Sequence, residues 1–123
     1  QLRYVDLLRS RYMDYVQDVS VFMVSNYRLQ VLDPKIRRRI ASVISNFYRI
    51  AAEFAANNND SKFELRLAFG LVRSLATSTR FILDRHLARG MFLRARYLLE
   101  QIVRLEAGCY DSYRVPVEEI FCG

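Results

Sequence analysis

The stretch from Asp33 to Phe54 constrains the fold more than any other part of the chain. It opens with Asp33, a residue type that caps helix N-termini, and with Pro34, which fits the first helical turn. Apolar residues then recur every three or four positions, which predicts a long helix with one apolar face. That face is formed by Ile36, Ile40, Val43, Ile44, Phe47, Ile50, Ala51 and Phe54. We expect it to pack in the core.

Three further segments show a helical period, so the sequence predicts four helices. A first helix is expected over residues 2–26, a third over residues 61–88 and a fourth over residues 91–107. Ser61 and Glu64 match a capping box at the start of the third helix, and Arg89-Gly90 matches a C-terminal stop. Gly70, inside the third helix, predicts close packing against a neighbouring helix.

The links between these helices are short, which is typical of helices that pack antiparallel to one another. We therefore expect an all-α fold, an antiparallel up-down four-helix bundle over residues 1–108. Residues 109–123 form an acidic C-terminal tail, which we expect to dock on the bundle or on another subunit. At 123 residues the chain is long enough to bury a core without metals or disulfides.

The composition indicates a cytoplasmic protein. Cys109 and Cys122 lack the spacing of metal ligands and are expected to be free thiols, as in a reducing compartment. Arginine interrupts the longest apolar runs, so we expect no membrane span. We expect no metal or other cofactor either.

The sequence has few candidate catalytic residues, and we expect the protein not to be an enzyme. His86 is the only histidine, and neither a glycine-rich phosphate loop nor a nucleophile–base pair is recognisable. One alternative is that Arg80 and His86 resemble the Arg-x(4–6)-His motif of HEPN ribonucleases, which are also small helical bundles. There an arginine can stabilise the transition state while histidine moves a proton. The resemblance is incomplete, because Phe81 stands where those enzymes usually have a polar residue.

A second interpretation of the same segment is purely structural. In it, Arg80 pairs with Asp84 one turn further on. Arg85, His86 and Arg89 would then complement the negative C-terminal end of the third helix.

The charge of the chain favours binding to polyanions. The formal net charge is +6, and Lys35 and Lys62 are the only lysines, so the basic side chains are nearly all arginine. Arginine suits bidentate contacts with phosphate. Arginines recur on the second and third predicted helices, away from the apolar stripes. The sequence therefore predicts a nucleic-acid-binding surface that consists of Arg37, Arg38, Arg39, Arg49, Arg66, Arg73 and Arg80.

The segment Arg39–Asn46, RIASVISN, followed by Phe63 and by Leu67-Ala68-x-Gly70, resembles a known family. The family contains the four-helix-bundle proteins encoded in bacterial ribosomal RNA intervening sequences and the accessory variability proteins of diversity-generating retroelements. The likeness covers most of residues 5–107. Where the ribosomal branch usually has Ile-Ala-Glu-Gly after the asparagine, this chain has Phe47-Tyr48-Arg49, which shifts the comparison towards the retroelement branch.

The resemblance implies a basic bundle that assembles into a ring-like homopentamer and binds a reverse transcriptase and nucleic acid. A fainter resemblance is to the helical small subunit of type III CRISPR effector complexes. Our hypothesis is a non-enzymatic accessory subunit of a nucleoprotein complex that binds RNA or DNA backbone. The alternative is a protein-interaction or oligomerisation module. The eight tyrosines and eight phenylalanines exceed what one small core needs, which favours a homo-oligomer or a protein partner.

Overall fold

The computed structural model describes residues 1, 3 and 13–122, and the predicted all-α class is confirmed for them. The helices are α1 (Tyr15–Tyr27), α2 (Pro34–Asn57), α3 (Phe63–Ser78), the 3-10 turn η2 (Thr79–Phe81), α4 (Arg85–Val103) and the short π-helix η3 (Glu118–Cys122). The first helix was expected over residues 2–26, of which residues 2 and 4–12 lie outside the described part. Within that part the helix begins after Asp14, whose carboxylate accepts a hydrogen bond from the Val16 amide at 3.1 Å.

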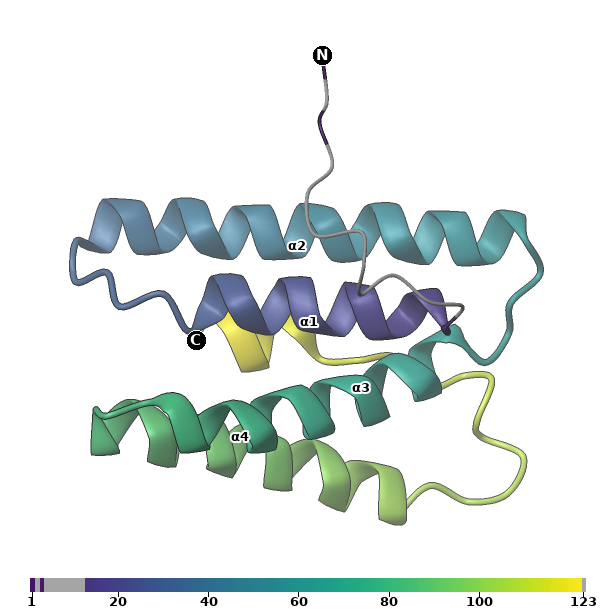
Figure 1. Cartoon of the computed structure of the whole chain (residues 1–123). Helices are drawn as coiled ribbons and strands as arrows, with labels where there is room; N and C mark the ends of the chain where they lie inside the picture. The colour runs from purple at the N-terminus through teal and green to yellow at the C-terminus, as the bar shows by residue number, and fades with distance from the viewer. Residues whose placement is uncertain (2, 4–12, 123) are drawn as a thin grey trace.

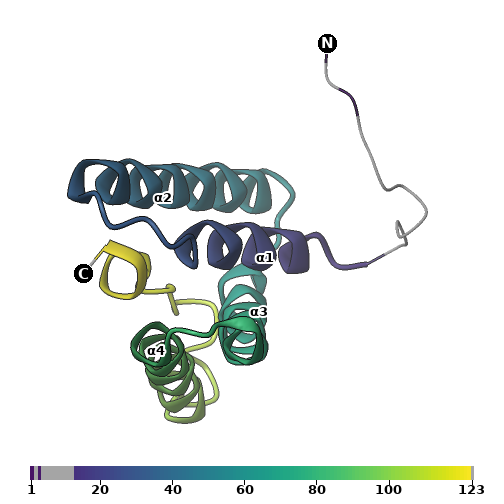
Figure 2. The ribbon, with the colours of Figure 1, turned by 60° about the vertical axis from the view of Figure 1, so that its left-hand side comes forward.

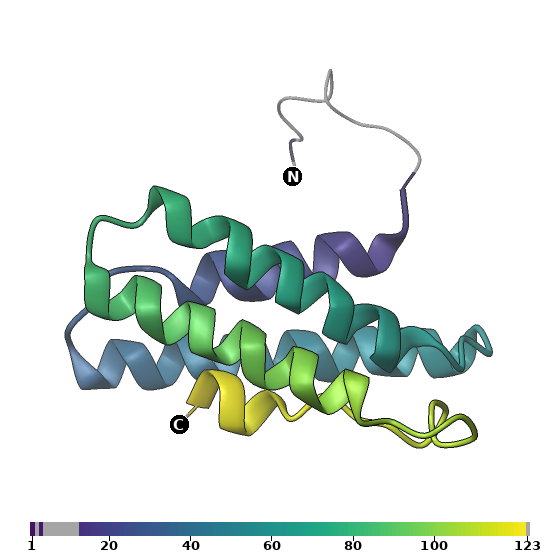
Figure 3. The same ribbon diagram turned by 90° about the horizontal axis from the view of Figure 1, so that it is seen from below.

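Consecutive α-helices run in opposite directions (Figure 1). Their order in space differs from their order in the chain, because α1 lies between α2 and α3, and α3 lies between α1 and α4 (Figure 2). The C-terminal η3 lies in the space that remains between α2 and α4 (Figures 2 and 3). The start of α2 and the start of α4 are consequently at the same end of the molecule, together with the C-terminal ends of α1 and α3.

The core lies among the four α-helices and η3. Its largest fully buried side chains include Met23, Ile44, Leu67, Met91 and Ile120. The helices α1 and α3 approach each other closely at Gly70. A Cβ atom on Gly70 would lie 2.9 Å from the Ser20 hydroxyl oxygen, so the close packing predicted at this glycine is confirmed.

The start of α2 is as predicted, whereas the start of α3 is not. Asp33 caps α2, and its side chain accepts a hydrogen bond from the Lys35 amide at 2.8 Å. The capping box expected at Ser61 and Glu64 is wrong, because the N-cap of α3 is Lys62 and no side chain bonds to the cap. Glu64 is buried instead, where its carboxylate binds partners from distant parts of the chain.

The third and fourth helices meet earlier than the sequence predicted. The third helix was expected to reach residue 88, yet α3 ends at Ser78 and η2 follows it. Asp84 then caps α4, accepting hydrogen bonds from the amides of His86 at 2.8 Å and Leu87 at 3.2 Å. Gly90, which was expected to stop a helix, lies inside α4.

The C-terminal tail docks on the helices, as expected. Val115, Val117, Ile120 and Phe121 are buried. Arg94 of α4 donates a hydrogen bond from Nε to the Ile120 carbonyl at 2.7 Å. On the other side, the hydroxyl of Ser45 on α2 donates to the carboxylate of Glu118 at 2.9 Å. Cys109 and Cys122 are free thiols, as expected.

The prediction that the whole apolar face of α2 packs in the core is wrong. Ile44 and Ala51 are buried, and Ile40 and Phe47 are half-buried. The remaining large side chains stay exposed: Ile36 (43%), Val43 (47%), Ile50 (57%) and Phe54 (53%). The reason is geometric, since α1 and η3 pack on one side of α2 and its outer side faces away from the molecule (Figure 2).

Candidate nucleic-acid interface

Two of the seven predicted arginines hold the fold together. Arg66 of α3 donates from Nε and Nη2 to the Asp14 carboxylate at 2.8 and 2.9 Å, and from Nη1 to Asp60 at 2.6 Å. Arg37 of α2 donates from Nη1 to the carbonyls of Tyr27 and Leu29 at 3.2 and 2.9 Å, which closes the link between α1 and α2. Both guanidinium groups are therefore occupied by the protein itself.

The contacts of Arg66 form a small charged network at the start of α1 and α3. Tyr15 donates a hydrogen bond to Asp60 at 2.6 Å, and its pKa is raised to about 12 by burial and by this carboxylate. The hydrogen bond from Arg66 lowers the pKa of Asp14. Burial acts to raise the pKa of Asp60, but the hydrogen bonds from Arg66 and Tyr15 outweigh it and leave that pKa below its ordinary value. The carboxylates in turn raise the pKa of Arg66.

The other five predicted arginines are exposed. Arg49 lies 3.7 Å from Glu53 one turn further along α2, with both side chains mostly in solvent. The guanidinium of Arg80 stacks over the ring of Phe81, 4.7 Å from its centroid. Arg38, Arg39 and Arg73 form no salt bridge with any residue in the described part of the chain.

The predicted arginines of α2 and those of α3 do not form one continuous surface. Because α1 lies between α2 and α3, the exposed faces of those two helices are separated over most of the molecule (Figure 2). Arg80 does not share a helix with Arg66 and Arg73, since it belongs to η2 and not to α3.

Basic residues gather instead at one end of the molecule. The antiparallel order brings residues 28–39 and residues 80–89 to the end where α2 and α4 begin, on the left in Figure 1. The acidic residues in these two segments are Asp33 and Asp84, and both carboxylates cap helices. We call this surface the basic end; it consists of the exposed Arg28, Lys35, Arg38, Arg39, Arg80, Arg85 and Arg89.

Sequence reasoning missed Arg28, Lys35, Arg85 and Arg89 as candidates. It placed Arg85 and Arg89, with His86, at the C-terminal end of a helix, where positive charge is favourable. In the structure they occupy the first turns of α4, and the expected pairing of Arg80 with Asp84 is replaced by the capping role of Asp84. A signal was present, because an aspartate that follows Leu83 and precedes a new apolar period matches a helix start.

Arg80 and His86, the pair that resembles a ribonuclease motif, flank the junction between η2 and α4 and are both exposed. They do not share a helix. His86 donates its backbone amide to Asp84, as the second residue of α4.

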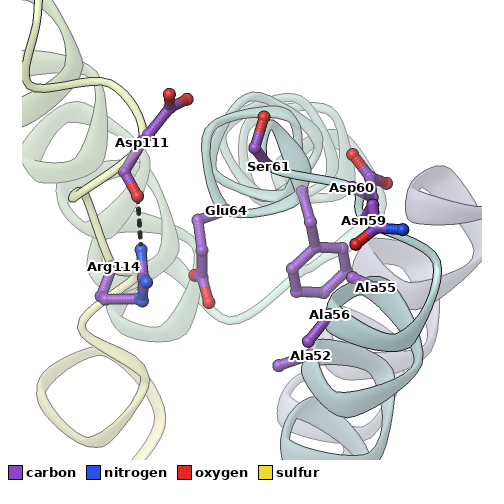
Figure 4. Close-up of a pocket in the computed structure, with 10 residues that line it drawn as sticks. Ala52, Ala55, Ala56, Asn59, Asp60, Ser61, Glu64, Asp111 and Arg114 are labelled. Atoms are coloured by element: carbon purple, nitrogen blue, oxygen red, sulfur yellow. Dashed lines mark hydrogen bonds between the residues drawn. The ribbon is translucent and has the colours of Figure 1, made fainter.

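A pocket of about 590 Å³ lies where the end of α2, the start of α3 and residues 111–114 meet (Figure 4). Its charged groups already have partners within the protein. Asp111 accepts a hydrogen bond from Lys62 Nζ at 2.7 Å, and Arg114 donates to the Asp111 carbonyl at 2.9 Å. Asp60 and Glu64 are likewise engaged. We therefore place the candidate site at the basic end and not in this pocket.

No known protein family, curated protein or solved structure matches the chain. The family resemblance thus rests on the residues quoted above. Across residues 1, 3 and 13–122, no helix has both the length and the apolar character needed to cross a membrane. The same part of the chain contains no group of three or more His, Cys, Asp or Glu residues arranged to hold a metal ion.

Proposed function

We propose that the protein is a non-enzymatic, cytoplasmic accessory subunit of a nucleoprotein complex, built as an antiparallel four-helix bundle, and that its basic end binds the phosphate backbone of RNA or DNA. The basic end is the observation that carries this proposal. It gathers seven exposed basic side chains from α2, η2, α4 and the residue that follows α1, while the two carboxylates within these segments serve as helix caps. Such a surface attracts a polyanion without reading its base sequence.

The helices themselves add to the positive potential at this end. A helix carries partial positive charge at its N-terminus, and both α2 and α4 begin here. Neither has an acidic residue in its first turn; instead Lys35 follows the cap of α2 and Arg85 follows the cap of α4. Basic side chains at these positions repel the helix dipole, and a bound phosphate would relieve that repulsion.

The seven arginines that the sequence singled out take different parts in this proposal. Arg38, Arg39 and Arg80 belong to the basic end; Arg38 and Arg80 would contact phosphate directly, and Arg39 adds to the positive charge of this end. Arg49 and Arg73 extend the positive surface along α2 and α3. Arg37 and Arg66 position the helices, because their guanidinium groups are already bonded within the protein.

The experiment compares two pairs of arginines at opposite ends of α4. Arg85→Gln with Arg89→Gln removes two charges from the basic end, whereas Arg96→Gln with Arg104→Gln removes one charge from the second half of α4 and one from its C-cap. Binding to labelled single-stranded RNA and duplex DNA is measured by fluorescence anisotropy across a salt series. We expect the salt slope, log Kobs against log [salt], to fall by about 2 for the first pair and to stay unchanged for the second.

Equal decreases in the salt slope for the two pairs would mean that net charge alone governs binding. No decrease for either pair would overturn the proposal. The thermal unfolding midpoint of each variant shows whether its fold is intact. A preference for RNA over DNA in the same titrations would identify the natural polymer.

A second candidate function is favoured by a different observation. The exposed apolar residues on α2 are typical of a protein-interaction or oligomerisation module. The two functions are compatible, since an accessory subunit needs a protein partner as well as nucleic acid. By the family resemblance, a reverse transcriptase is one candidate for that partner.

A further inference from the structure

The outer side of α2 carries an apolar strip with a regular spacing. Successive members are four, three, four, three and four residues apart, and they are Ile36, Ile40, Val43, Phe47, Ile50 and Phe54. This alternation is that of the a and d positions of a coiled coil. From Ile36 to Phe54 the strip is about 27 Å long at the rise of an α-helix, which is enough for several layers of paired side chains.

The fold covers only one edge of this strip. The ring of Phe22 on α1 lies 4.0 Å from the ring of Phe47, and the ring of Tyr15 lies 5.3 Å from that of Phe54. The other edge, with Ile36, Val43 and Ile50, remains exposed in the part of the chain that the structure describes. In Figures 1 and 2, α2 is an outer helix with a long side that no other drawn helix covers.

Polar residues border the exposed edge of the strip at intervals of seven. They are Arg39, Asn46 and Glu53, which are positive near the start of α2, neutral at its middle and negative near its end. Glu53 also lies 3.7 Å from Arg49 of its own helix, but both side chains are 66% exposed, so the carboxylate can bind a second arginine. Two such borders complement each other when the helices run antiparallel, because Arg39 then faces the partner's Glu53 and the two Asn46 side chains meet. Parallel helices would instead place the two Arg39 side chains at one level and the two Glu53 side chains at another.

We propose that two copies of this chain associate through α2, antiparallel, about a twofold axis near Asn46. The layers then pair Ile36 with the partner's Phe54, Ile40 with the partner's Ile50 and Val43 with the partner's Phe47. Such an interface uses the same strip on both copies, as twofold interfaces do. It does not depend on nucleic-acid binding. Because α2 begins at the basic end, this pairing puts the two basic ends at opposite ends of the dimer.

The mass of the protein in solution tests the association, after nucleic acid has been removed and its absence checked by absorbance. We expect light scattering to give twice the chain mass of 14.5 kDa. Val43→Glu with Ile50→Glu places charges in the seam and should give a monomer. The matched control is Leu99→Glu with Val103→Glu, which changes two exposed apolar residues of α4 and should leave the dimer intact.

A monomeric wild-type protein at concentrations of about 100 µM, far above the dissociation constant of a stable dimer, would overturn the proposal. So would a larger assembly that both double variants disrupt, since that result would mean that α2 of one copy packs on α4 of the next.

Charge reversal tests the direction of the pairing. Arg39→Glu alone, or Glu53→Arg alone, opposes like charges across the seam and should shift the dimer towards monomer. The combination Arg39→Glu with Glu53→Arg restores opposite charges in the antiparallel arrangement and should restore the dimer mass. A combined variant that dissociates as much as the single variants would refute the antiparallel arrangement. These readouts are masses, so a failure here is distinct from a failure of nucleic-acid binding.

Discussion

The carboxylate of Glu64 on α3 accepts a hydrogen bond from the backbone amide of Val115 at 3.0 Å, across 51 residues of chain. Its other oxygen accepts a hydrogen bond from the hydroxyl of Tyr48 on α2 at 2.7 Å. Burial of Tyr48 and the neighbouring carboxylate both raise the pKa of that hydroxyl, so it remains a donor at neutral pH. One buried side chain therefore ties α2 and the C-terminal segment to α3.

Replacement of Glu64 by leucine should destabilise the protein. The buried amide of Val115 would be left without an acceptor, so we expect the free energy of unfolding to fall by about 1–3 kcal/mol, and the half-buried hydroxyl of Tyr48 would lose its acceptor at a smaller cost. Glu64→Gln keeps an oxygen that can accept the hydrogen bond from the Val115 amide, so it should lower the free energy of unfolding by less. Urea denaturation measures both variants. A leucine variant as stable as the glutamine variant would contradict this role.

Glu64 also shows why local sequence patterns mislead. Its position three residues after Ser61 matches a capping box, which is a local arrangement. The structure uses the carboxylate for Tyr48 and Val115, which are distant in the chain and close only after folding. The start of α2 was predictable because Asp33 and Pro34 act within one turn. Arg66 was assigned to a binding surface for the same kind of reason, since nothing near it in the sequence indicates its bonds to Asp14.

Gly70 and Gly90 both lie inside helices, yet alanine should have opposite effects at the two positions. At Gly70 the added methyl group would lie 2.9 Å from the Ser20 hydroxyl, so overpacking should cost about 1–3 kcal/mol. At Gly90 the nearest atom is Nη1 of Arg94 at 3.3 Å, at the end of a long side chain that needs to shift by only a few tenths of an ångström, so the better helix propensity of alanine should add up to about 1 kcal/mol.

Thermal unfolding of the two alanine variants checks this pair of predictions. Adding Ser20→Gly to Gly70→Ala removes the side chain that the new methyl group would meet and should recover part of the loss. A Gly70→Ala protein that melts above the wild type would show that α1 and α3 can separate without cost.

The helix break at residues 79–84 was missed because the segment consists mainly of apolar and basic residues. Such residues fit a continuous helix as well as a junction between two helices. Ile82 and Leu83 continue the period of α3, and nothing local shows that Leu83 is exposed. The exposed strip of α2 was missed for a related reason. A period of three and four residues predicts that one face of a helix avoids water, but it does not say whether the covering surface belongs to the same chain.

The network of Arg66 should make stability depend on acid pH. The pKa values of Asp14 and Asp60 are lowered in the folded protein from an ordinary value of 3.8. As the pH falls, the unfolded chain binds protons before the folded one does, so the stabilisation is complete above the ordinary pKa and is lost as the pH falls through the lowered one. Unfolding free energies measured below about pH 4 should therefore decline steeply.

Arg66→Gln should flatten that decline, because it removes the guanidinium whose hydrogen bonds and charge help to lower the pKa values of both carboxyl groups. Arg49→Gln is the control, since Arg49 lies in solvent 3.7 Å from Glu53 and should leave the acid profile unchanged. If Arg66→Gln follows the wild-type profile, the network does not contribute to the acid dependence.

At the start of α4, stability and the proposed function should oppose each other. Arg85 is the first residue of this helix, where its charge repels the helix dipole. Arg85→Glu should therefore raise the free energy of unfolding by about 0.3–1 kcal/mol at low salt and less at high salt. The same change should weaken nucleic-acid binding, because it reverses a charge at the basic end. Arg96→Glu is the control, since Arg96 lies mid-helix and pairs with Glu100 at 2.8 Å, so its reversal should not stabilise the protein. If the Arg85 variant gains stability and keeps full affinity, Arg85 does not contribute to nucleic-acid binding. A gain in stability with a loss of affinity would show that the charge of Arg85 destabilises the fold and strengthens binding.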